Sequence, residues 1–284
     1  MNSNFIKAIE ASVQAGKEIL KVYYSDDLGV EFKDDESPLT LADKAAHNVI
    51  MECLSEINIP VLSEEGRGIV HDERKDWSQF WMVDPLDGTK EFIKKGNDFT
   101  VNIALIENGY PTFGVVFAPV LGKLYYGDVQ NGAYMIQLEE GWEKIKDYKL
   151  EPQQALKLPL QKREDDKFIV VASKSHLSKE TVDFVDQVKK DHRELEFVSI
   201  GSSLKICMVA EGKADLFPRL SPCMEWDTAA GQAVLESAGM NIVQYPEGKR
   251  VEYNKENLLN PWFVVYGERL TDNAVLNYMQ SCNR

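Results

Sequence analysis

The sequence has little cysteine and no long uninterrupted apolar run. Its four cysteines stand at positions 53, 207, 223 and 282, form no Cys-x-x-Cys pair and are accompanied by no closely spaced pair of histidines. This spacing argues against a structural zinc site and a disulfide framework, so we expect free thiols in a reducing compartment. No segment approaches the roughly 18 consecutive apolar residues that cross a membrane. Residues 1–24 carry charges where a signal peptide is apolar, so we expect a cytoplasmic protein without an integral membrane segment.

Positive charge is also scarce. The chain has 32 lysines and arginines against 46 acidic residues, a formal net charge of −14. Because non-specific binding to nucleic acid needs a basic surface, we expect no nucleic-acid partner. An acidic protein can still bind a phosphorylated small molecule where a cationic pocket or bound metal ions reverse the local field.

The chain is long enough for two packed lobes. It has 284 residues, 44% of them hydrophobic. Helical periodicity over 5–23 and from 40 to 57, followed by an antiparallel meander over 99–137, predicts an α+β lobe at 1–150. Residues 138–166 are predicted to connect the lobes, and the alternating strands and helices that follow predict an α/β lobe at 151–284. Together these predict a layered α/β (α+β) sandwich of two sheets interleaved with helices.

Acidic residues stand where apolar strands end. Glu64 follows one strand, Asp84 and Asp87 end another, and Asp227 stands at a predicted helix start. Each has a simpler explanation: Glu64 as a solvated loop acid, Asp-Pro-Leu-Asp-Gly as a plain turn, and Asp227 as a helix cap. However, the close Asp84 and Asp87 carboxylates repel unless a cation lies between them, and oxygen ligands without histidine or cysteine favour Mg²⁺.

Gly88 and Thr89 follow the acidic pair directly. If a helix begins there, its free N–H groups face the cation and can bind a phosphate oxygen. A second helix is predicted to open at Thr40, with Asp43 three residues further on in a capping-box arrangement. The spacing therefore suggests a metal-bridged phosphate as a hypothesis.

Three segments, VLSEE, WMVDPLDGTKEF and EWDTAAG, resemble signatures of the lithium-sensitive, magnesium-dependent phosphatases. This superfamily includes inositol monophosphatases, fructose bisphosphatases and 3′(2′),5′-bisphosphate nucleotidases, and the chain resembles the nucleotidases over nearly its whole length. The resemblance implies the sandwich fold of that superfamily, two or three Mg²⁺ ions and hydrolysis by a metal-activated water.

The resemblance also implies a role for each matching residue. The carboxylates of Glu64, Asp84, Asp87 and Asp227 and the main-chain carbonyl of Leu86 match metal ligands. Asp43 and the Thr89 hydroxyl match the pair that orients the attacking water, and Glu65 matches an acid just behind the ligands. The residues matched to substrate binding are Glu64, Asp87, Gly88, Thr89, His176, Ser202, Ser203, Lys205, Arg219 and Asp227.

Arg219 is the residue that best indicates which substrate is bound. Inositol phosphatases typically have an acid at this position, which binds sugar hydroxyls, whereas a guanidinium suits phosphate. The substrate implied is 3′-phosphoadenosine 5′-phosphate, the by-product of sulfate activation, cleaved to AMP and phosphate, with the phosphosulfate form as a second substrate. Taken singly, Lys205 and His176 are also compatible with ordinary surface residues.

Two alternatives remain at this point. One is a phosphatase for inositol or fructose phosphates, and the other is a metal- or nucleotide-binding regulator without turnover. The resemblance further allows a monomer or a homodimer, and close relatives suggest peripheral association with the inner membrane.

Overall fold

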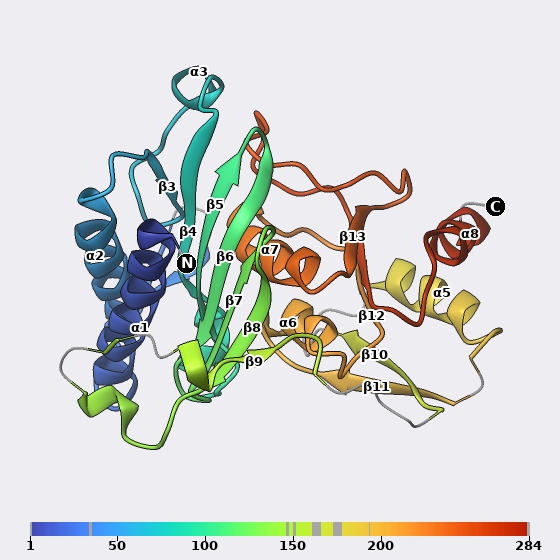
Figure 1. The fold of residues 1–284 in the computed structure, drawn as a ribbon, viewed down its shortest axis with the longest axis horizontal. Coiled ribbons are helices and arrows are strands. Elements are labelled where there is room, and N and C mark those ends of the chain that lie inside the picture. The colour runs from blue at the N-terminus through green and yellow to red at the C-terminus, as the bar shows by residue number, and fades with distance from the viewer. Residues whose placement is uncertain are drawn as a thin grey trace.

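The computed structural model describes residues 2–33, 36–145, 148–149, 152–160, 166–172, 178–192 and 194–282. Within this part of the chain, two large sheets alternate with three layers of helices (Figure 1). The layered sandwich predicted from the sequence is thus confirmed.

The first sheet contains the predicted meander. Among the described residues it has seven strands in the order β3-β4-β5-β6-β7-β8-β9, of which only the β3–β4 pair is parallel. β9 lies within the stretch 138–166, which the sequence pattern predicted only as a connection. The bounds are β3 Val61–Ser63, β4 Gln79–Asp87, β5 Thr100–Glu107, β6 Tyr110–Ala118, β7 Lys123–Asp128, β8 Gly132–Gln137 and β9 Leu156–Lys157.

The second sheet mixes parallel and antiparallel pairs. Its described strands run in the order β11-β10-β12-β14-β13, with β10 parallel to both β11 and β12. A two-stranded hairpin, β1 and β2, precedes the second helix. The bounds are β10 Phe168–Ala172, β11 Leu195–Ser199, β12 Leu216–Arg219, β13 Asn241–Gln244, β14 Phe263–Tyr266, β1 Glu31–Phe32 and β2 Pro38–Leu39.

Helices cover both sheets because the strands present apolar side chains on both faces. Along β4, Trp81 and Val83 pack against α1 and α2, whereas Phe80 and Met82 face the opposite side, where α6 and α7 separate the sheets. α5 and α8 lie on the outer face of the second sheet (Figure 1). The bounds are α1 Ser3–Tyr23, α2 Leu41–Ser55, α3 His71–Arg74, α4 Thr89–Ile93, α5 Lys179–Val188, α6 Leu204–Ala210, α7 Ala229–Ser237 and α8 Asp272–Cys282.

α7 packs directly on the first sheet because Gly114 leaves room for it. A Cβ at Gly114 would run into the main-chain carbonyl of Ala230. This close approach fixes the beginning of α7 over the middle of the sheet, and with it the turn that precedes α7. No helix among the described residues is both long and apolar enough to span a bilayer.

Candidate metal and phosphate site

An irregularity in β4 brings its two aspartates together. In a regular strand, residues 84 and 87 would point to opposite faces because side chains alternate. The pairing of β4 with β5 shifts register between Asp84 and Asp87, where Pro85 supplies no N–H to the ladder. Asp84 is 1% exposed, and its Oδ1 accepts a 3.0 Å hydrogen bond from the Leu86 N–H. The strand end thus directs both carboxylates into one space.

Asp227 reaches the same space from a 3₁₀ turn, Glu225–Asp227, that precedes α7. Carboxylate oxygens of Asp84, Asp87 and Asp227 all lie within 4.8 Å of one another. The Asp227 Oδ2 accepts hydrogen bonds from the Met224 N–H at 3.0 Å and the Cys223 thiol at 3.3 Å. It therefore closes its own turn and does not cap α7, whose N-cap is Thr228.

Glu64 lies beside this trio because β3 runs parallel to β4. The Glu64 N–H donates to the Val83 carbonyl at 3.0 Å, so the end of β3 stands next to Asp84. Its carboxylate pairs with Lys33, 3.0 Å away, and the same ammonium lies 2.5 Å from Glu65. Glu64 is therefore a paired acid at the edge of the site and not a free loop acid.

Burial and mutual repulsion raise the pKa values of these acids. The pKa of Asp84 is raised well above its ordinary value by burial and then by Glu64, Asp87 and Asp227. Burial, Asp87 and Glu64 raise the pKa of Asp227 to about 7. Burial also raises the pKa of Glu64, against the opposing charge of Lys33. The chemistry of this donor set fits a divalent cation, because clustered carboxylate oxygens are hard ligands whose repulsion a cation relieves.

Asp43 and Thr89 meet next to the acids. The Thr89 hydroxyl lies 3.2 Å from the Asp43 Oδ1 and 3.3 Å from the Leu86 carbonyl oxygen. The other oxygen of Asp43 accepts from the N–H and hydroxyl of Thr40, which confirms the predicted capping box. Burial and Glu65 raise the pKa of Asp43, while the hydrogen bonds from Thr40 and Thr89 oppose that shift. Its cap leaves one oxygen of Asp43 directed at Thr89.

A short helix, α4, does begin directly after the acidic pair, which meets the condition for a phosphate site there. Gly88 is the N-cap of α4 and has φ +99°, a left-handed conformation that L side chains rarely adopt. A Cβ here would also approach the Phe99 backbone at 3.3 Å. The glycine therefore allows the sharp turn that starts α4 beside the carboxylates.

Asp87 is held by Ser203, at the start of α6, and by Asn102 of the neighbouring strand β5. The Ser203 N–H donates to the Asp87 Oδ2 at 2.7 Å, and the Ser203 hydroxyl lies 2.9 Å from that oxygen and 2.6 Å from the Asp227 carbonyl. The Asn102 amide donates to the Ser203 hydroxyl at 2.8 Å. Ser203 thus joins two of the three clustered acids, and its hydroxyl is already engaged with the protein.

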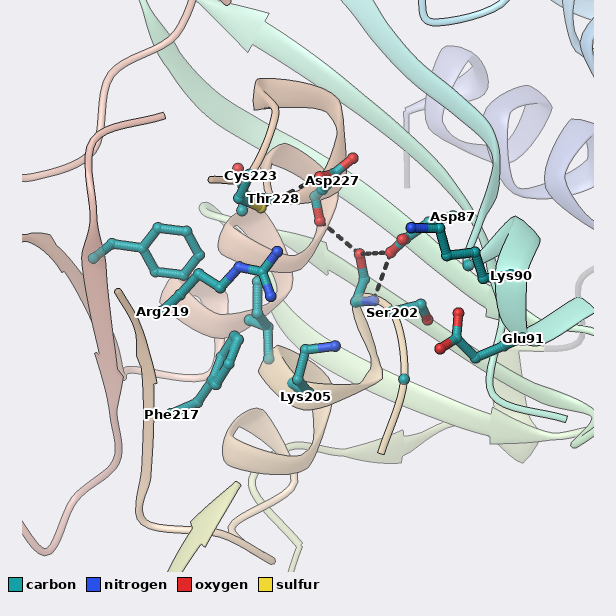
Figure 2. Close-up of a pocket in the computed structure, with 15 residues that line it drawn as sticks. Asp87, Lys90, Glu91, Ser202, Lys205, Phe217, Arg219, Cys223, Asp227 and Thr228 are labelled. Atoms are coloured by element: carbon teal, nitrogen blue, oxygen red, sulfur yellow. Dashed lines mark hydrogen bonds between the residues drawn. The ribbon is translucent and has the colours of Figure 1, made fainter. Parts of the chain in front are cut away.

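A cavity opens from Asp87 and Asp227 toward strands β12 and β14 of the second sheet (Figure 2). The side chains of Lys205 and Arg219 point into it from one side, and Lys90 and Glu91 lie on the opposite side. The remaining lining residues are Asp87, Gly88, Gly201, Ser202, Ser203, Ile206, Phe217, Cys223, Asp227, Thr228 and Phe263. The cavity therefore joins an acidic end to a cationic wall.

The cationic wall has spare hydrogen-bonding capacity. Arg219 donates from Nη2 to the Pro222 carbonyl at 2.8 Å, but its buried Nε has no hydrogen-bond partner among the described residues. Lys205 is 8% exposed and its ammonium lies 5.7 Å from the centre of the Phe217 ring. Burial lowers the pKa of Lys205, and Asp87 opposes that shift. Both side chains can therefore bind an anion in the cavity.

Ser202 and His176 are the two remaining residues that the sequence predicted to bind substrate. Ser202 lines the cavity with φ +47°, and its hydroxyl lies 3.2 Å from that of Thr100. His176 lies outside the described residues.

Sequence reasoning missed several residues at the site. Lys33 gave no signal, because it stands in a short hairpin far from Glu64 along the chain. Asn102 did give one, as a polar residue within an apolar strand. Lys90 and Glu91 line the cavity from within the motif WMVDPLDGTKEF, and Cys223 lines it two residues before EWDTAAG, so their positions in the sequence could have revealed all three.

Comparison with known proteins gives the fold and site a context. The model of the inositol monophosphatase family matches residues 1–281. The chain is 44% identical over 255 residues to the 3′(2′),5′-bisphosphate nucleotidase CysQ of Salmonella typhimurium, covering 88% of this chain and 94% of that protein. It is 36% identical over 264 residues to CysQ of Haemophilus influenzae, covering 91% of each.

A solved structure agrees with these sequence matches. The crystal structure of CysQ from Bacteroides thetaiotaomicron superposes with a TM-score of 0.85 at 46% identity, over 94% of this chain and 98% of that one. That protein is described as a bacterial member of the inositol monophosphatase family. The chain described here therefore belongs to the inositol monophosphatase family, a family of metal-dependent phosphatases.

Proposed function

We propose that this enzyme is a Mg²⁺-dependent 3′(2′),5′-bisphosphate nucleotidase that hydrolyses 3′-phosphoadenosine 5′-phosphate to AMP and phosphate. The observation that supports this most is the cavity itself, which joins Asp87 and Asp227 of the carboxylate trio at one end to Lys205 and Arg219 at the other. The two relatives named above as bisphosphate nucleotidases are 44% and 36% identical to this chain over the matched residues. A substrate with two phosphates suits a site with two places for negative charge.

The metal is held by residues of the first lobe and the turn before α7. The carboxylates of Glu64, Asp84, Asp87 and Asp227 and the carbonyl of Leu86 are the proposed ligands of two or three Mg²⁺ ions. When bound, these ions lower the pKa of a water and neutralise charge on the scissile phosphate and the leaving oxygen. Lys33 neutralises part of the charge on Glu64 and would compete with a bound cation for that carboxylate.

Asp43 and Thr89 orient the attacking water. The Thr89 hydroxyl donates to Asp43 and its oxygen accepts a hydrogen bond from the water, which fixes the direction of attack. The water oxygen bonds to phosphorus as the bond from phosphorus to O3′ breaks, and the leaving oxygen ends protonated. One water is consumed, and the products are AMP and phosphate. The raised pKa of Asp43 suits a group that shares a proton during this step.

The remaining contacts select the substrate. The N–H groups at Gly88 and Thr89 bind oxygens of the scissile phosphate at the start of α4. Lys205, Arg219 and the Ser202 hydroxyl bind the second phosphate and the nucleoside, and Ser203 acts mainly by holding Asp87. Guanidinium is a two-pronged phosphate donor, but unlike a carboxylate it cannot accept hydrogen bonds from sugar hydroxyls, which disfavours inositol phosphates. The proposed reaction takes place in the cytoplasm on a freely diffusing nucleotide.

Phosphate release from three substrates tests the proposal. The substrates are 3′-phosphoadenosine 5′-phosphate, inositol 1-phosphate and fructose 1,6-bisphosphate, each assayed with Mg²⁺ and with a chelator. We expect Mg²⁺-dependent release with a strong preference for the nucleotide. Preference for a sugar phosphate would overturn the substrate assignment and leave the metal site standing. Nucleotide binding without release from any substrate would instead support a regulator without turnover.

A further inference from the structure

The turn that carries Asp227 is joined along its length to the segment 254–260. The Glu225 N–H donates to the Leu258 carbonyl at 2.9 Å, and the Asn260 N–H donates to the Cys223 carbonyl at 2.8 Å. The Asn260 side-chain amide adds a 2.8 Å hydrogen bond to the Met224 carbonyl. The position of Asp227 therefore depends on a second segment that lies more than 25 residues further along the chain.

Glu225 makes this junction with a fully buried charge. Its side chain is 0% exposed and accepts hydrogen bonds from the Asn254 N–H at 2.7 Å, the Lys255 N–H at 3.1 Å and the Lys255 ammonium at 2.5 Å. Removing one partner of such a pair leaves an uncompensated charge and is strongly destabilising. Glu225 thus ties its turn firmly to Lys255.

Arg74 fixes the other side of the same segment. It is 2% exposed at the end of α3, and its Nη1 lies 2.8 Å from both the Asn254 Oδ1 and the Lys255 carbonyl oxygen. Its Nη2 donates to the Glu256 carbonyl at 3.0 Å, and the Asn254 amide donates back to the Arg74 carbonyl at 2.8 Å. Arg74 belongs to the first lobe, so these contacts join the lobe that carries Asp84 to the segment that holds Asp227.

We propose that Glu225, Lys255 and Arg74, here called the Glu225 network, hold Asp227 at the distance from Asp84 and Asp87 that a shared metal ion requires. The reason is electrostatic. Three carboxylates within 4.8 Å repel one another, and the 3₁₀ turn alone closes only one backbone hydrogen bond on the Asp227 side chain. The Glu225 network opposes this repulsion before a cation is present, so it preorganises the site.

The members of the Glu225 network act through Asp227 and are positioning residues. The described residues that line the cavity do not include Arg74, Glu225 or Lys255. None of the three therefore faces a substrate bound in the cavity. Their loss should weaken metal binding more than it affects nucleotide binding. This inference rests on the proposed metal role of Asp227.

The test compares two lysines that each pair with a fully buried glutamate. Lys255→Met removes the partner of Glu225, and Lys213→Met, the matched control, removes a partner of Glu211, whose side chain is also 0% exposed. Isothermal titration with MgCl₂ measures metal affinity directly, and thermal unfolding in chelator measures stability. The KM for 3′-phosphoadenosine 5′-phosphate is measured at saturating Mg²⁺.

We expect Lys255→Met to raise the Kd for Mg²⁺ about tenfold or more, as is typical when a group behind a metal ligand is lost. The KM should stay near the wild-type value, and Lys255→Arg should restore the metal affinity. Lys213→Met should lower the unfolding temperature but leave the Kd for Mg²⁺ unchanged. If Lys255→Met does not fold, Arg74→Lys takes its place. This variant keeps the positive charge but loses part of the forked guanidinium, so its Kd for Mg²⁺ should show a smaller rise.

The two possible failures can be told apart. If the wild-type enzyme binds no Mg²⁺, the proposed metal role and this inference are overturned together. If the wild-type enzyme binds Mg²⁺ and the folded variants bind it equally well, only the Glu225 network loses its assigned role.

Discussion

The two ends of the cavity are built in opposite ways. At the acidic end, like charges lie within 4.8 Å of one another and are held by main-chain donors, serine and the folded turn itself. At the cationic end, the described residues offer Lys205 and Arg219 few hydrogen bonds, and the buried Arg219 Nε has no hydrogen-bond partner among them. An end that binds metal must be rigid, whereas an end that receives an anion must keep its donors free.

Removing one charge from the acidic end should have the largest effect on turnover. Asp84→Asn should lower kcat by about 1000-fold, which corresponds to roughly 4 kcal/mol of transition-state stabilisation. The protein should remain folded, because the amide oxygen can still accept from the Leu86 N–H. Steady-state kinetics in Mg²⁺ and circular dichroism measure the two effects.

Asp128→Asn is the matched control for that variant. Asp128 is also a buried aspartate at a strand end, but it accepts from the turn residues Gln130 and Asn131. Its replacement should leave kcat unchanged. An Asp84→Asn enzyme with most of its activity would refute the metal role of the acidic end.

The second prediction concerns the pair that orients the water. Thr89→Ala should lower kcat about 100-fold, since positioned acid–base groups typically contribute 10²–10⁴. KM should change little, because the hydroxyl acts on the water and not on the nucleoside. Thr89→Ser keeps the hydroxyl 3.2 Å from Asp43 and should retain most activity. Equal losses in the alanine and serine variants would contradict the assigned role.

The third prediction tests the cationic end. Lys205→Met keeps the length of the side chain and its contact with Phe217 but removes the charge. KM for 3′-phosphoadenosine 5′-phosphate should rise about tenfold, the scale of one charge-assisted hydrogen bond, while kcat changes less. A variant that loses kcat at constant KM would place Lys205 at the acidic end of the reaction instead.

The smallest expected effect is on stability without metal. Folding raises the pKa of Asp227 from 3.8 to about 7, so between these values the unfolded chain is ionised while the folded carboxyl still holds its proton. Stability contributed by this group therefore falls as pH rises from about 4 to about 7. In chelator, the unfolding temperature of the wild type relative to Asp227→Asn should drop by a few °C across this window.

Saturating Mg²⁺ should abolish that drop, because a bound cation stabilises the ionised carboxylates. A difference between wild type and Asp227→Asn that stays constant with pH, or rises, would contradict the raised pKa.

Local patterns in the sequence predicted much of this fold. The meander of β5 to β8 follows from alternating apolar runs separated by Asn-Gly and Leu-Gly turns, and α4 begins at Thr89, where the sequence allowed a helix start. Many candidate site residues lie within short motifs, because a strand end and the turn that follows it are contiguous in the chain. These signals are local, so composition and spacing were enough to read them.

Other features depend on contacts that no local pattern contains. The pairing of Lys33 with Glu64 arises because a distant hairpin folds over the end of β3. Asp227 was expected to begin a helix, yet its carboxylate closes a 3₁₀ turn, since the neighbouring segment 254–260 fixes that turn from outside. Ser203 was expected to bind substrate, and the structure engages its hydroxyl with Asp87 because α6 begins directly under the acidic end.

In the proposed enzyme, the cationic end of the cavity binds the second phosphate of the substrate while the first phosphate is hydrolysed at the acidic end. The most direct test measures kcat/KM for 3′-phosphoadenosine 5′-phosphate and for 3′-AMP, which lacks the second phosphate, with wild-type enzyme and with Arg219→Ala. We predict that the wild type prefers the bisphosphate by about 30-fold or more and that Arg219→Ala loses most of this preference, while 3′-AMP turnover is nearly unchanged. An equal preference in both enzymes would contradict the account, because Arg219 would then play no part in recognising the second phosphate.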